Sequence, residues 1–281
     1  MDSMCAQHRK AARPTGQNSR YCFRFLRAMP FWPRSTPGSE AIGVLCSRLE
    51  RHFDAIRRET AVILKPVLAA DGTDSEDVDG ESSGDASGSA DSATESAGRW
   101  QAHGEGLHSG VWLRCELWAH GKRQDRNCAA LPTLGAILDS SVAIMRDPPG
   151  RVYLSLMLTG GDGTAVKPHS GPTNHRLRIH LPILLPQNGP QLSITVGGCR
   201  RPWVTGQCLV LDDSFEHSVD LRVAAHMSDT SATSSSTTTD GAATGEHALG
   251  CRARVLLVCD VWHPDAEWLV PCERRMSAAG S

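Results

Sequence analysis

Apolar and polar residues alternate over several short runs in the second half of the chain, and a period of two predicts β-strands. Residues 254–262 are almost continuously apolar, which is typical of a strand in the middle of a sheet. Strands are expected at 111–118, 151–158, 176–181, 192–196, 203–211 and 254–262. Residues 121–127 are expected to form a turn, and residues 159–168 a flexible connector.

The period changes between residues 39 and 64, where apolar residues recur every three or four positions and predict an amphipathic helix. Ser39 stands where it can cap the first turn, and Pro66 where it can end the last one. A shorter helix is expected at 132–138. Because the long helix has one apolar face, we expect it to buttress one face of the sheet.

Two low-complexity stretches interrupt this pattern. Residues 69–98 are rich in Ser, Asp, Gly and Ala, and residues 224–250 in Ser, Thr, Ala and Gly. Such compositions bury too little apolar surface to offset the entropy of ordering. We therefore expect two disordered insertions within one domain that spans residues 29–270.

The two ends of the chain are expected to be tails. Residues 1–28 hold six basic residues against one acid, which favours a disordered basic tail, although an organellar targeting peptide has the same composition. Residues 271–281 are expected to be a C-terminal tail. No run approaches the roughly 18 apolar residues of a membrane span, and no signal peptide is expected. The compartment is left open.

The formal net charge of -2 conceals an asymmetry, because residues 71–95 hold nine of the 31 acids and no base. The remainder is mildly basic but has no clustered Lys/Arg run, so nucleic-acid binding is not expected. The ten cysteines form no CxxC pair and show no zinc spacing. Cys115, Cys208 and Cys259 lie in apolar runs and are expected to be core residues, while disulfide formation is left open.

Two histidines suggest a metal site. His169 and His217 lie about fifty residues apart, each beside a turn signal and next to a predicted strand. An iron oxygenase with two histidines and one carboxylate usually carries Asp or Glu two residues after the first histidine, but here Gly171 stands there. Taken alone, His169 could as well be an ordinary loop histidine.

Basic residues strengthen the case for a site. Arg176, Arg178 and His180 would lie in one row on a strand, and that row must face a cleft, an anion or, at a sheet edge, solvent. Arg254 opens the central apolar run, and a buried arginine needs a carboxylate or phosphate partner. A dicarboxylate cosubstrate would supply that partner.

Three blocks of the sequence resemble the catalytic domain of the aspartyl/asparaginyl β-hydroxylase family, whose members are Fe(II)- and 2-oxoglutarate-dependent oxygenases. The blocks are HSGPTNHRLRIHL from His169, WVTGQCLVLDDSFEHSV from Trp203 and RVLLVCDVWHP from Arg254, in the family's order. The resemblance implies a mainly β fold: a double-stranded β-helix, also called a jelly roll and cupin-like, with buttressing helices.

The resemblance also implies roles for individual residues. His169 and His217 would be the iron ligands, and Asp213 an acidic residue that holds a metal-bound water. Gly171 is no departure, because the family also lacks the carboxylate at that position. Together these residues imply an iron centre with only two protein ligands.

Four further residues match positions that bind the organic partners. Ser155, His180 and Arg254 correspond to residues that bind 2-oxoglutarate, and Arg178 to an arginine on the substrate side. One departure is the 37-residue distance from His217 to Arg254, which is much longer than in the family. The extra length would have to loop out without moving the strand.

The implied function is that of a peptide-aspartate β-dioxygenase: with O2 and 2-oxoglutarate, the enzyme would hydroxylate the β-carbon of Asp or Asn residues in a protein or peptide. The motifs leave two alternatives open. One is the same chemistry on a lipid or on a free or carrier-bound amino acid. The other is a non-catalytic metal-binding β-helix domain.

Overall fold

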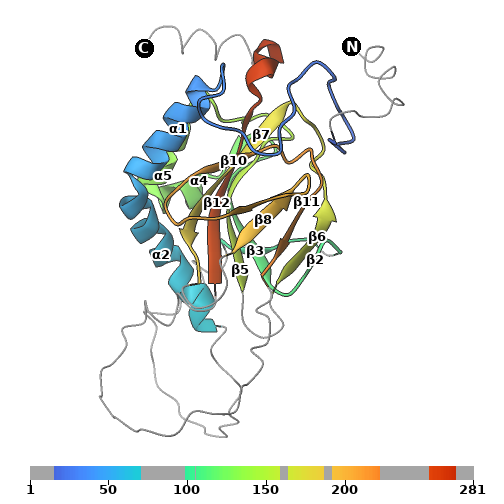
Figure 1. The fold of residues 1–281 in the computed structure, drawn as a ribbon. Helices are drawn as coiled ribbons and strands as arrows, with labels where there is room; N and C mark the ends of the chain where they lie inside the picture. Colours follow the sequence, from blue (N-terminus) through green and yellow to red (C-terminus); the bar gives the residue numbers. More distant parts are fainter. Residues whose placement is uncertain are drawn as a thin grey trace, which may run out of the picture.

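The computed structural model describes residues 16–70, 99–104, 106–158, 164–186, 192–221 and 253–269. Two antiparallel sheets pack face to face, and helices cover the outer face of the larger sheet (Figure 1). This arrangement confirms the predicted double-stranded β-helix. The expected insertion at 224–250 and the tail at 271–281 lie outside the described residues, as do residues 71–98.

Within the described ranges, the larger sheet contains seven strands. They are β1 (Gln101–Ala102), β3 (Trp112–Ala119), β4 (Lys122–Arg123), β5 (Val152–Leu158), β7 (Arg176–Leu184), β10 (Leu209–Leu211) and β12 (Ala253–Trp262). Their order is β1-β3-β5-β12-β7-β10, with β4 paired to β3. The central position predicted for the strand that begins near Arg254 is therefore confirmed.

Five strands of the described part of the chain form the smaller sheet, and the sequence predicted only β8 among them. In spatial order they are β2 (His108–Ser109), β6 (Ala165–His169), β11 (His217–Asp220), β8 (Ser193–Val196) and β9 (Cys199–Pro202). The sequence predicted a flexible connector up to residue 168. That prediction was wrong for residues 165–168, which belong to β6. That strand buries only Val166 and contains a proline, so its sequence carries no strand signal.

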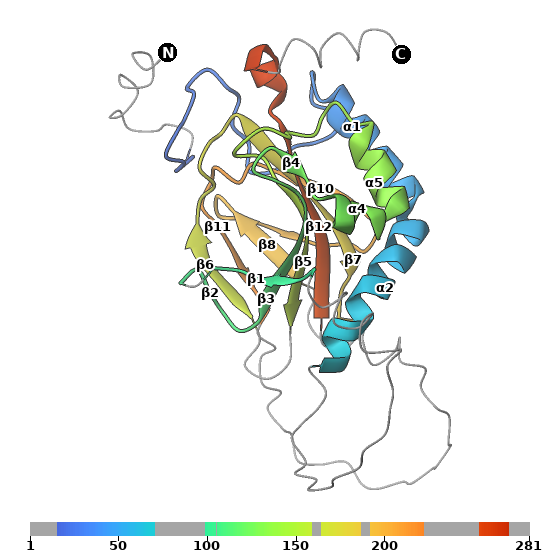
Figure 2. The same cartoon turned by 180° about the vertical axis from the view of Figure 1, so that it is seen from behind.

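The helices are α1 (Glu40–Arg51), α2 (Phe53–Ala70), α4 (Asp125–Ala129), α5 (Pro132–Asp139) and the 3-10 helix η2 (Pro264–Leu269). The view from behind shows α4 and α5 on the same side of the molecule as α1 and α2 (Figure 2). The expected turn at 121–127 includes β4 and the start of α4. Within the part of the chain that the structure describes, no helix combines the length and apolarity that a membrane span requires.

The start of the predicted long helix was correct, but its continuity and its end were wrong. Helix α1 begins directly after Ser39, which occupies the N-cap position, and the predicted helix is divided at His52 into α1 and α2. Ser39 makes no side-chain capping bond, and its hydroxyl is buried without a partner among the described residues. Pro66 lies inside α2 rather than at its end. A proline removes the bond to the carbonyl four residues earlier, and that residue, Val62, is solvent-exposed.

The core has two layers. The outer layer lies between the helices and the larger sheet and includes Leu177, Ile179 and Leu257. The inner layer lies between the two sheets and includes Leu256 and Val258. Because side chains alternate along a strand, the polar residues of β7 and β12 that alternate with the outer layer face the space between the sheets.

Part of the predicted N-terminal tail is ordered. Residues 1–15 lie outside the described residues, but Gln17 forms a β-bridge with Phe215, and Tyr21 forms one with Thr173. The segment crosses the upper end of the sandwich in Figure 1. The expectation of a disordered tail was therefore wrong for residues 16–28, whose buried hydrogen bonds the composition could not reveal.

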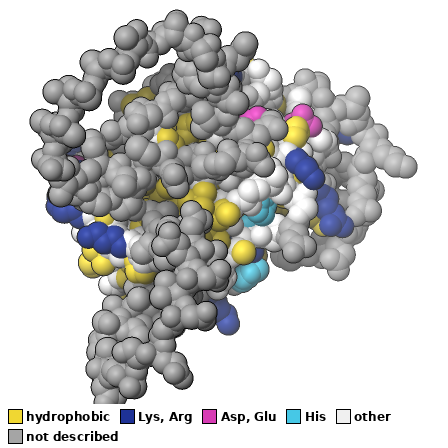
Figure 3. All heavy atoms as spheres, turned by 90° about the horizontal axis from the view of Figure 1, so that it is seen from below, with side chains coloured by type: hydrophobic (Ala, Val, Ile, Leu, Met, Phe, Trp, Pro, Cys, Tyr) yellow, Lys and Arg dark blue, Asp and Glu magenta, His cyan; other side chains and the backbone are white. Residues whose placement is uncertain are grey.

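The surface seen from below carries histidine side chains beside an apolar stretch, with Lys and Arg side chains on either side (Figure 3).

Most of the cysteines expected in the core lie in the core. Cys115 and Cys259 are fully buried, and Cys208 is half-buried. Every cysteine in the described ranges is a free thiol.

Candidate functional site

The tertiary fold places the two candidate metal-binding histidines side by side. Strands β6 and β11 pair antiparallel, and His169 is the register partner of His217. Directly opposed residues of an antiparallel pair share a face. The two imidazole rings accordingly lie with centroids 4.1 Å apart.

Backbone carbonyls fix the orientation of both rings. His169 Nδ1 bonds the carbonyl of Lys167 at 2.8 Å, and His217 Nδ1 bonds the carbonyl of Phe215 at 3.0 Å. A carbonyl only accepts, so each Nδ1 carries the hydrogen and each Nε2 keeps a lone pair for a metal.

Electrostatics keep both histidines neutral. Burial lowers the pKa of His169, and burial together with neighbouring His169 lowers the pKa of His217 to about 4. At neutral pH neither imidazole would have to lose a proton before it binds a metal ion.

The space beside His169 explains the glycine at position 171. A β-carbon on Gly171 would lie 2.4 Å from Oδ2 of Asp213, and the amide of Gly171 donates to the carbonyl of Asp213 at 2.6 Å. The Asp213 carboxylate thus occupies the place that a side chain at position 171 would need. Within the described ranges no group of three or more His, Cys, Asp and Glu could hold a metal ion, so these histidines would act as a pair.

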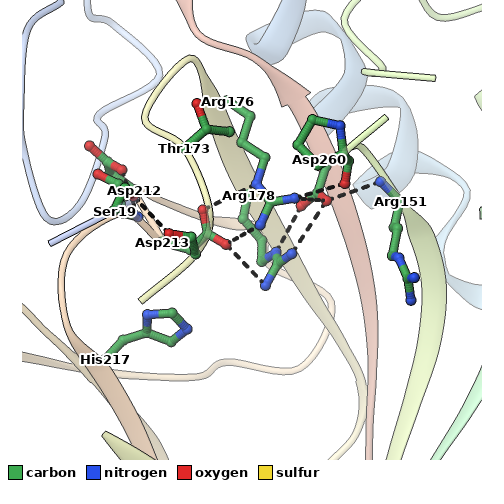
Figure 4. A network of polar contacts seen from close by, with 12 residues as sticks. Ser19, Arg151, Thr173, Arg176, Arg178, Asp212, Asp213, His217 and Asp260 are labelled. Atoms are coloured by element: carbon green, nitrogen blue, oxygen red, sulfur yellow. Dashed lines mark hydrogen bonds and ion pairs between the residues drawn. The ribbon is translucent and has the colours of Figure 1, made fainter. Parts of the chain in front are cut away.

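Asp213 belongs to a buried network of two arginines and two aspartates (Figure 4). Arg176 lies between both carboxylates, with Nη2 2.6 Å from Asp213 and Nη1 2.8 Å from Asp260. Arg178 contacts the same pair, at 3.3 Å and 2.8 Å respectively. Burial alone would raise the pKa of Asp213, but Arg176 and Arg178 outweigh it and the pKa is lowered. Asp213 is therefore ionised.

The sequence left open whether the basic residues of β7 face a cleft, an anion or solvent, and this network gives the answer. Arg176 and Arg178 face anions, and the protein itself carries those anions. Arg178, expected on the substrate side, keeps 14% of its side chain exposed. Burial alone would lower its pKa, but Asp260 and Asp213 raise it well above the usual value.

A second cationic position lies deeper between the sheets. Arg254 is 2% exposed, donates from Nη2 to Ser155 Oγ at 2.9 Å and lies over the ring of Trp203 at 4.9 Å. Its Nε has no partner among the described residues. Burial lowers its pKa to about 9, and no carboxylate of the described part offsets that effect. An anionic ligand would supply the missing charge.

Ser155 and His180 add to this donor set. Ser155 Oγ accepts from Arg254 and from Trp112 Nε1 at 3.0 Å, which leaves its hydroxyl hydrogen to donate elsewhere. His180 Nδ1 is buried without a partner among the described residues, and burial, followed by the charges of Arg178 and Arg254, lowers the pKa of His180 well below its usual value. A guanidinium, a hydroxyl and an imidazole suit a ligand carboxylate.

Aromatic rings cluster around Trp112, whose Nε1 donates to Ser155 Oγ. His103 stacks on Trp112 with ring centroids 3.7 Å apart and planes 10° apart. Burial, followed by the charge of Arg114, lowers the pKa of His103 to about 4. His108 meets the same Trp112 ring edge-on.

Sequence reasoning singled out the paired histidines and the buried Arg254 as candidates but missed other residues that the fold gathers around them. Arg176 and Asp260 were not assigned roles, although both lie in the quoted motif blocks. Trp112 and Trp203 were also missed. Their positions follow from strand register and ring packing, for which the sequence holds no direct signal.

A sequence model of the family described as aspartyl/asparaginyl beta-hydroxylase matches residues 50–225, which include both histidines and Asp213. The chain belongs to the aspartyl/asparaginyl β-hydroxylase family. The match includes neither Arg254 nor residues 16–28.

Individual members of the aspartyl/asparaginyl β-hydroxylase family show how far the similarity extends. Mouse aspartyl/asparaginyl beta-hydroxylase is 28% identical over 261 residues, which cover 92% of this chain and 26% of that protein. Human aspartate beta-hydroxylase domain-containing protein 2 is 32% identical over 158 residues, or 56% of this chain and 35% of that one. The chain thus spans about a quarter to a third of the length of these relatives.

Among solved structures, a prolyl hydroxylase from Trichoplax adhaerens in complex with a hypoxia inducible factor peptide covers 85% of this chain and 100% of that chain. The two are 11% identical, with a TM-score of 0.38. A prolyl-4-hydroxylase from Pseudomonas putida covers 62% of this chain with 13% identity and a TM-score of 0.31.

Proposed function

We propose that this protein is an Fe(II)- and 2-oxoglutarate-dependent dioxygenase that hydroxylates the β-carbon of Asp or Asn residues in a protein or peptide. The observation that carries the proposal is Arg254, a buried cation with no carboxylate partner among the described residues. Family membership and the oriented pair His169 and His217 support the same conclusion.

The donor set fits the two cofactors. His169 and His217 would hold Fe(II) through Nε2, because each Nδ1 is committed to a carbonyl. Arg254, Ser155 and His180 would bind the carboxylates of 2-oxoglutarate. When bound, Fe(II) with 2-oxoglutarate supplies the chemistry that divides O2 between succinate and a hydroxylated C–H bond.

Asp213 would act without binding the metal directly. Arg176 and Arg178 hold its carboxylate ionised beside Gly171, where related oxygenases with a carboxylate ligand would place that ligand. It would orient a water molecule in the coordination position that has no protein ligand. If Asp213→Ala kept full Fe(II) affinity and turnover, this role would have to be abandoned.

The test is conversion of 2-oxoglutarate to succinate by the purified protein with Fe(II), O2 and ascorbate. The control is the His169→Ala and His217→Ala double variant. We expect succinate from the wild-type protein only. A folded, metal-loaded wild-type protein that does not bind 2-oxoglutarate would overturn the proposal and favour a non-catalytic metal-binding domain.

A substrate screen then tests whether Asp or Asn residues in a protein or peptide are the substrate. Asp- or Asn-containing peptides should increase succinate formation and gain the mass of one oxygen atom, as measured by mass spectrometry. Arg178, the partly exposed arginine of the network, is the residue we assign to the substrate's acidic group. Oxygen incorporation into lipids or free or carrier-bound amino acids, with none into peptides, would contradict the assigned substrate while leaving the reaction type intact.

A further inference from the structure

The described N-terminal segment runs across the two loops that carry the metal-binding histidines. We call residues 17–23 the strap, residues 170–174 the first ligand loop and residues 212–216 the second ligand loop. The strap lies outside residues 50–225, which match the family. Figure 4 draws Ser19 of the strap in the same close-up as Asp212 and Asp213 of the second ligand loop.

Strap contacts reach the residue that orients His217. Gln17 pairs with Phe215 in an antiparallel β-bridge, and the amide of Asn18 donates to the carbonyl of Ser214 at 2.7 Å. The carbonyl of Phe215 in turn accepts the hydrogen bond from His217 Nδ1. The strap therefore holds the backbone that fixes the rotation of this imidazole.

A second set of contacts reaches the first ligand loop. Ser19 Oγ donates to the carbonyl of Gly171 at 2.8 Å, and the amide of Tyr21 donates to the carbonyl of Pro172 at 3.0 Å. The side chain of Asn174 exchanges two hydrogen bonds with the backbone of Phe23, at 2.8 and 2.9 Å. These contacts begin two residues after His169.

One side chain joins the two loops directly. Gln17 Nε2 donates to Asp212 Oδ2 at 2.7 Å, and Gln17 Oε1 accepts from Asn174 Nδ2 at 3.1 Å. Gln17 is 3% exposed, and both partners are fully buried. Buried hydrogen bonds with satisfied partners hold their geometry firmly, because an unpaired polar group there is costly.

The sheet is irregular beside the histidine pair. The β6–β11 ladder shifts register between His217 and Val219, so the pair lies beyond an irregularity. Gly16, next to the strap, has φ +74°, and a β-carbon there would lie 3.3 Å from the Phe215 ring. The chain thus passes close over the second ligand loop where the sheet itself is irregular.

We propose that the strap is a positioning element that sets the separation of His169 and His217, and that Gln17 is the positioning residue that links their loops. The inference rests on the proposed function, because it assumes that the histidines bind a metal. The inference also gives a role to Asp212 and Asn174, two motif residues that take no part in the proposed reaction. Both bind the strap through hydrogen bonds to Gln17.

The experiment compares variants of the whole 281-residue chain by anaerobic Co(II) titration. Visible absorption of bound Co(II) reports both affinity and coordination geometry, at a temperature well below metal-free unfolding. The variants are Gln17→Ala, Gln17→Glu, Asp212→Asn and the combination of Gln17→Glu with Asp212→Asn. Arg24→Ala, an exposed change next to the strap, is the matched control.

Gln17→Ala should weaken Co(II) binding by about tenfold or more and change the spectrum, as loss of groups that orient metal ligands does. Gln17→Glu should do more harm, because it places a second carboxylate against Asp212. The combined variant exchanges amide and carboxylate, preserves both hydrogen bonds and should restore most of the affinity. Arg24→Ala should bind as the wild-type protein does.

The two possible failures are distinguishable. Equal affinity and spectra in the wild-type protein and Gln17→Ala, or a combined variant no better than Gln17→Glu, would overturn the strap inference alone. Should Gln17→Ala not fold, the exchange of amide and carboxylate still decides the question. A folded wild-type protein that binds no Co(II) would overturn the proposed function and this inference together.

Discussion

Gly171 and Asp213 compete for one small volume beside His169, since a β-carbon at position 171 would lie 2.4 Å from Asp213 Oδ2. The negative charge near the proposed metal position therefore comes from a residue 42 positions further along the chain, where two arginines hold it. A side chain at position 171 and the Asp213 carboxylate are mutually exclusive in this backbone.

Gly171→Ala should displace Asp213 and disturb its contacts with the arginines. Overpacking of a tight site typically costs about 1–3 kcal/mol, so we expect a loss of that size in the free energy of unfolding, with weaker Co(II) binding. Urea unfolding and Co(II) titration measure the two effects. Gly43→Ala, in α1 with no close contact, is the control and should not destabilise the protein. Unchanged metal affinity in Gly171→Ala would contradict the packing argument.

Arg254→Met should separate cosubstrate binding from stability. Loss of a charge-assisted contact of about 1.5–3 kcal/mol corresponds to roughly a tenfold to hundredfold weaker affinity for 2-oxoglutarate. The metal-free protein should be equally stable or more stable, because a buried charge without a carboxylate partner among the described residues is replaced by an apolar side chain. Isothermal titration and urea unfolding report the two quantities. Arg51→Met, exposed on α1, should change neither, and unaltered 2-oxoglutarate affinity in Arg254→Met would remove Arg254 from the site.

Asp260→Asn should be strongly destabilising. Asp260 is fully buried between Arg176 and Arg178, and removal of one partner of a buried ionic network costs about 3–5 kcal/mol. Asp265→Asn is the matched control, because its ion pair with Arg27 is exposed and should contribute at most about 1 kcal/mol. Urea unfolding of the two variants provides the comparison. A small effect at Asp260 would mean that solvent enters the network.

The metal-free protein should lose stability as pH falls from about 6.5 towards 4. Burial, followed by the charge of Arg176, lowers the pKa of His175 to about 4, so in this window the unfolded chain binds protons that the folded chain does not. His103 and His217 act in the same direction. Asp212 opposes them, because burial raises the pKa of its carboxyl to about 6 and the folded state then binds the proton more readily.

His175→Gln tests this assignment without altering a proposed metal ligand. The variant should show a shallower fall in unfolding midpoint between pH 6.5 and 4 than the wild-type protein. Above pH 7 the two curves should run parallel, because His175 is neutral in both states there. If the unfolding midpoint fell equally steeply with pH in both proteins between pH 6.5 and 4, the lowered pKa of His175 would not be the cause of the acid-induced loss of stability.

Local sequence signals determined much of the fold. The alternation in β7 and the apolar run of β12 follow from the period of side chains along a strand, so both were predicted correctly. The start of the helix at Ser39 was also correct, although the Ser39 side chain makes no capping bond. The break at His52 and the continuation of α2 past Pro66 were not predicted. Strand β6 was missed because its pairing with β11, rather than its own pattern, makes it a strand.

The sequence by itself determined which chemistry is present: two histidines without a nearby carboxylate, a basic row and one isolated arginine, in motif blocks of a known family. Only the tertiary structure decided which of these groups pair with one another and which remain without a charged partner among the described residues. It paired Arg176 and Arg178 with Asp213 and Asp260, left Arg254 without a carboxylate among the described residues, and laid residues 17–23 across both ligand loops. The reason is physical: burial and charge pairing depend on distances between residues far apart in the chain, which no local pattern contains.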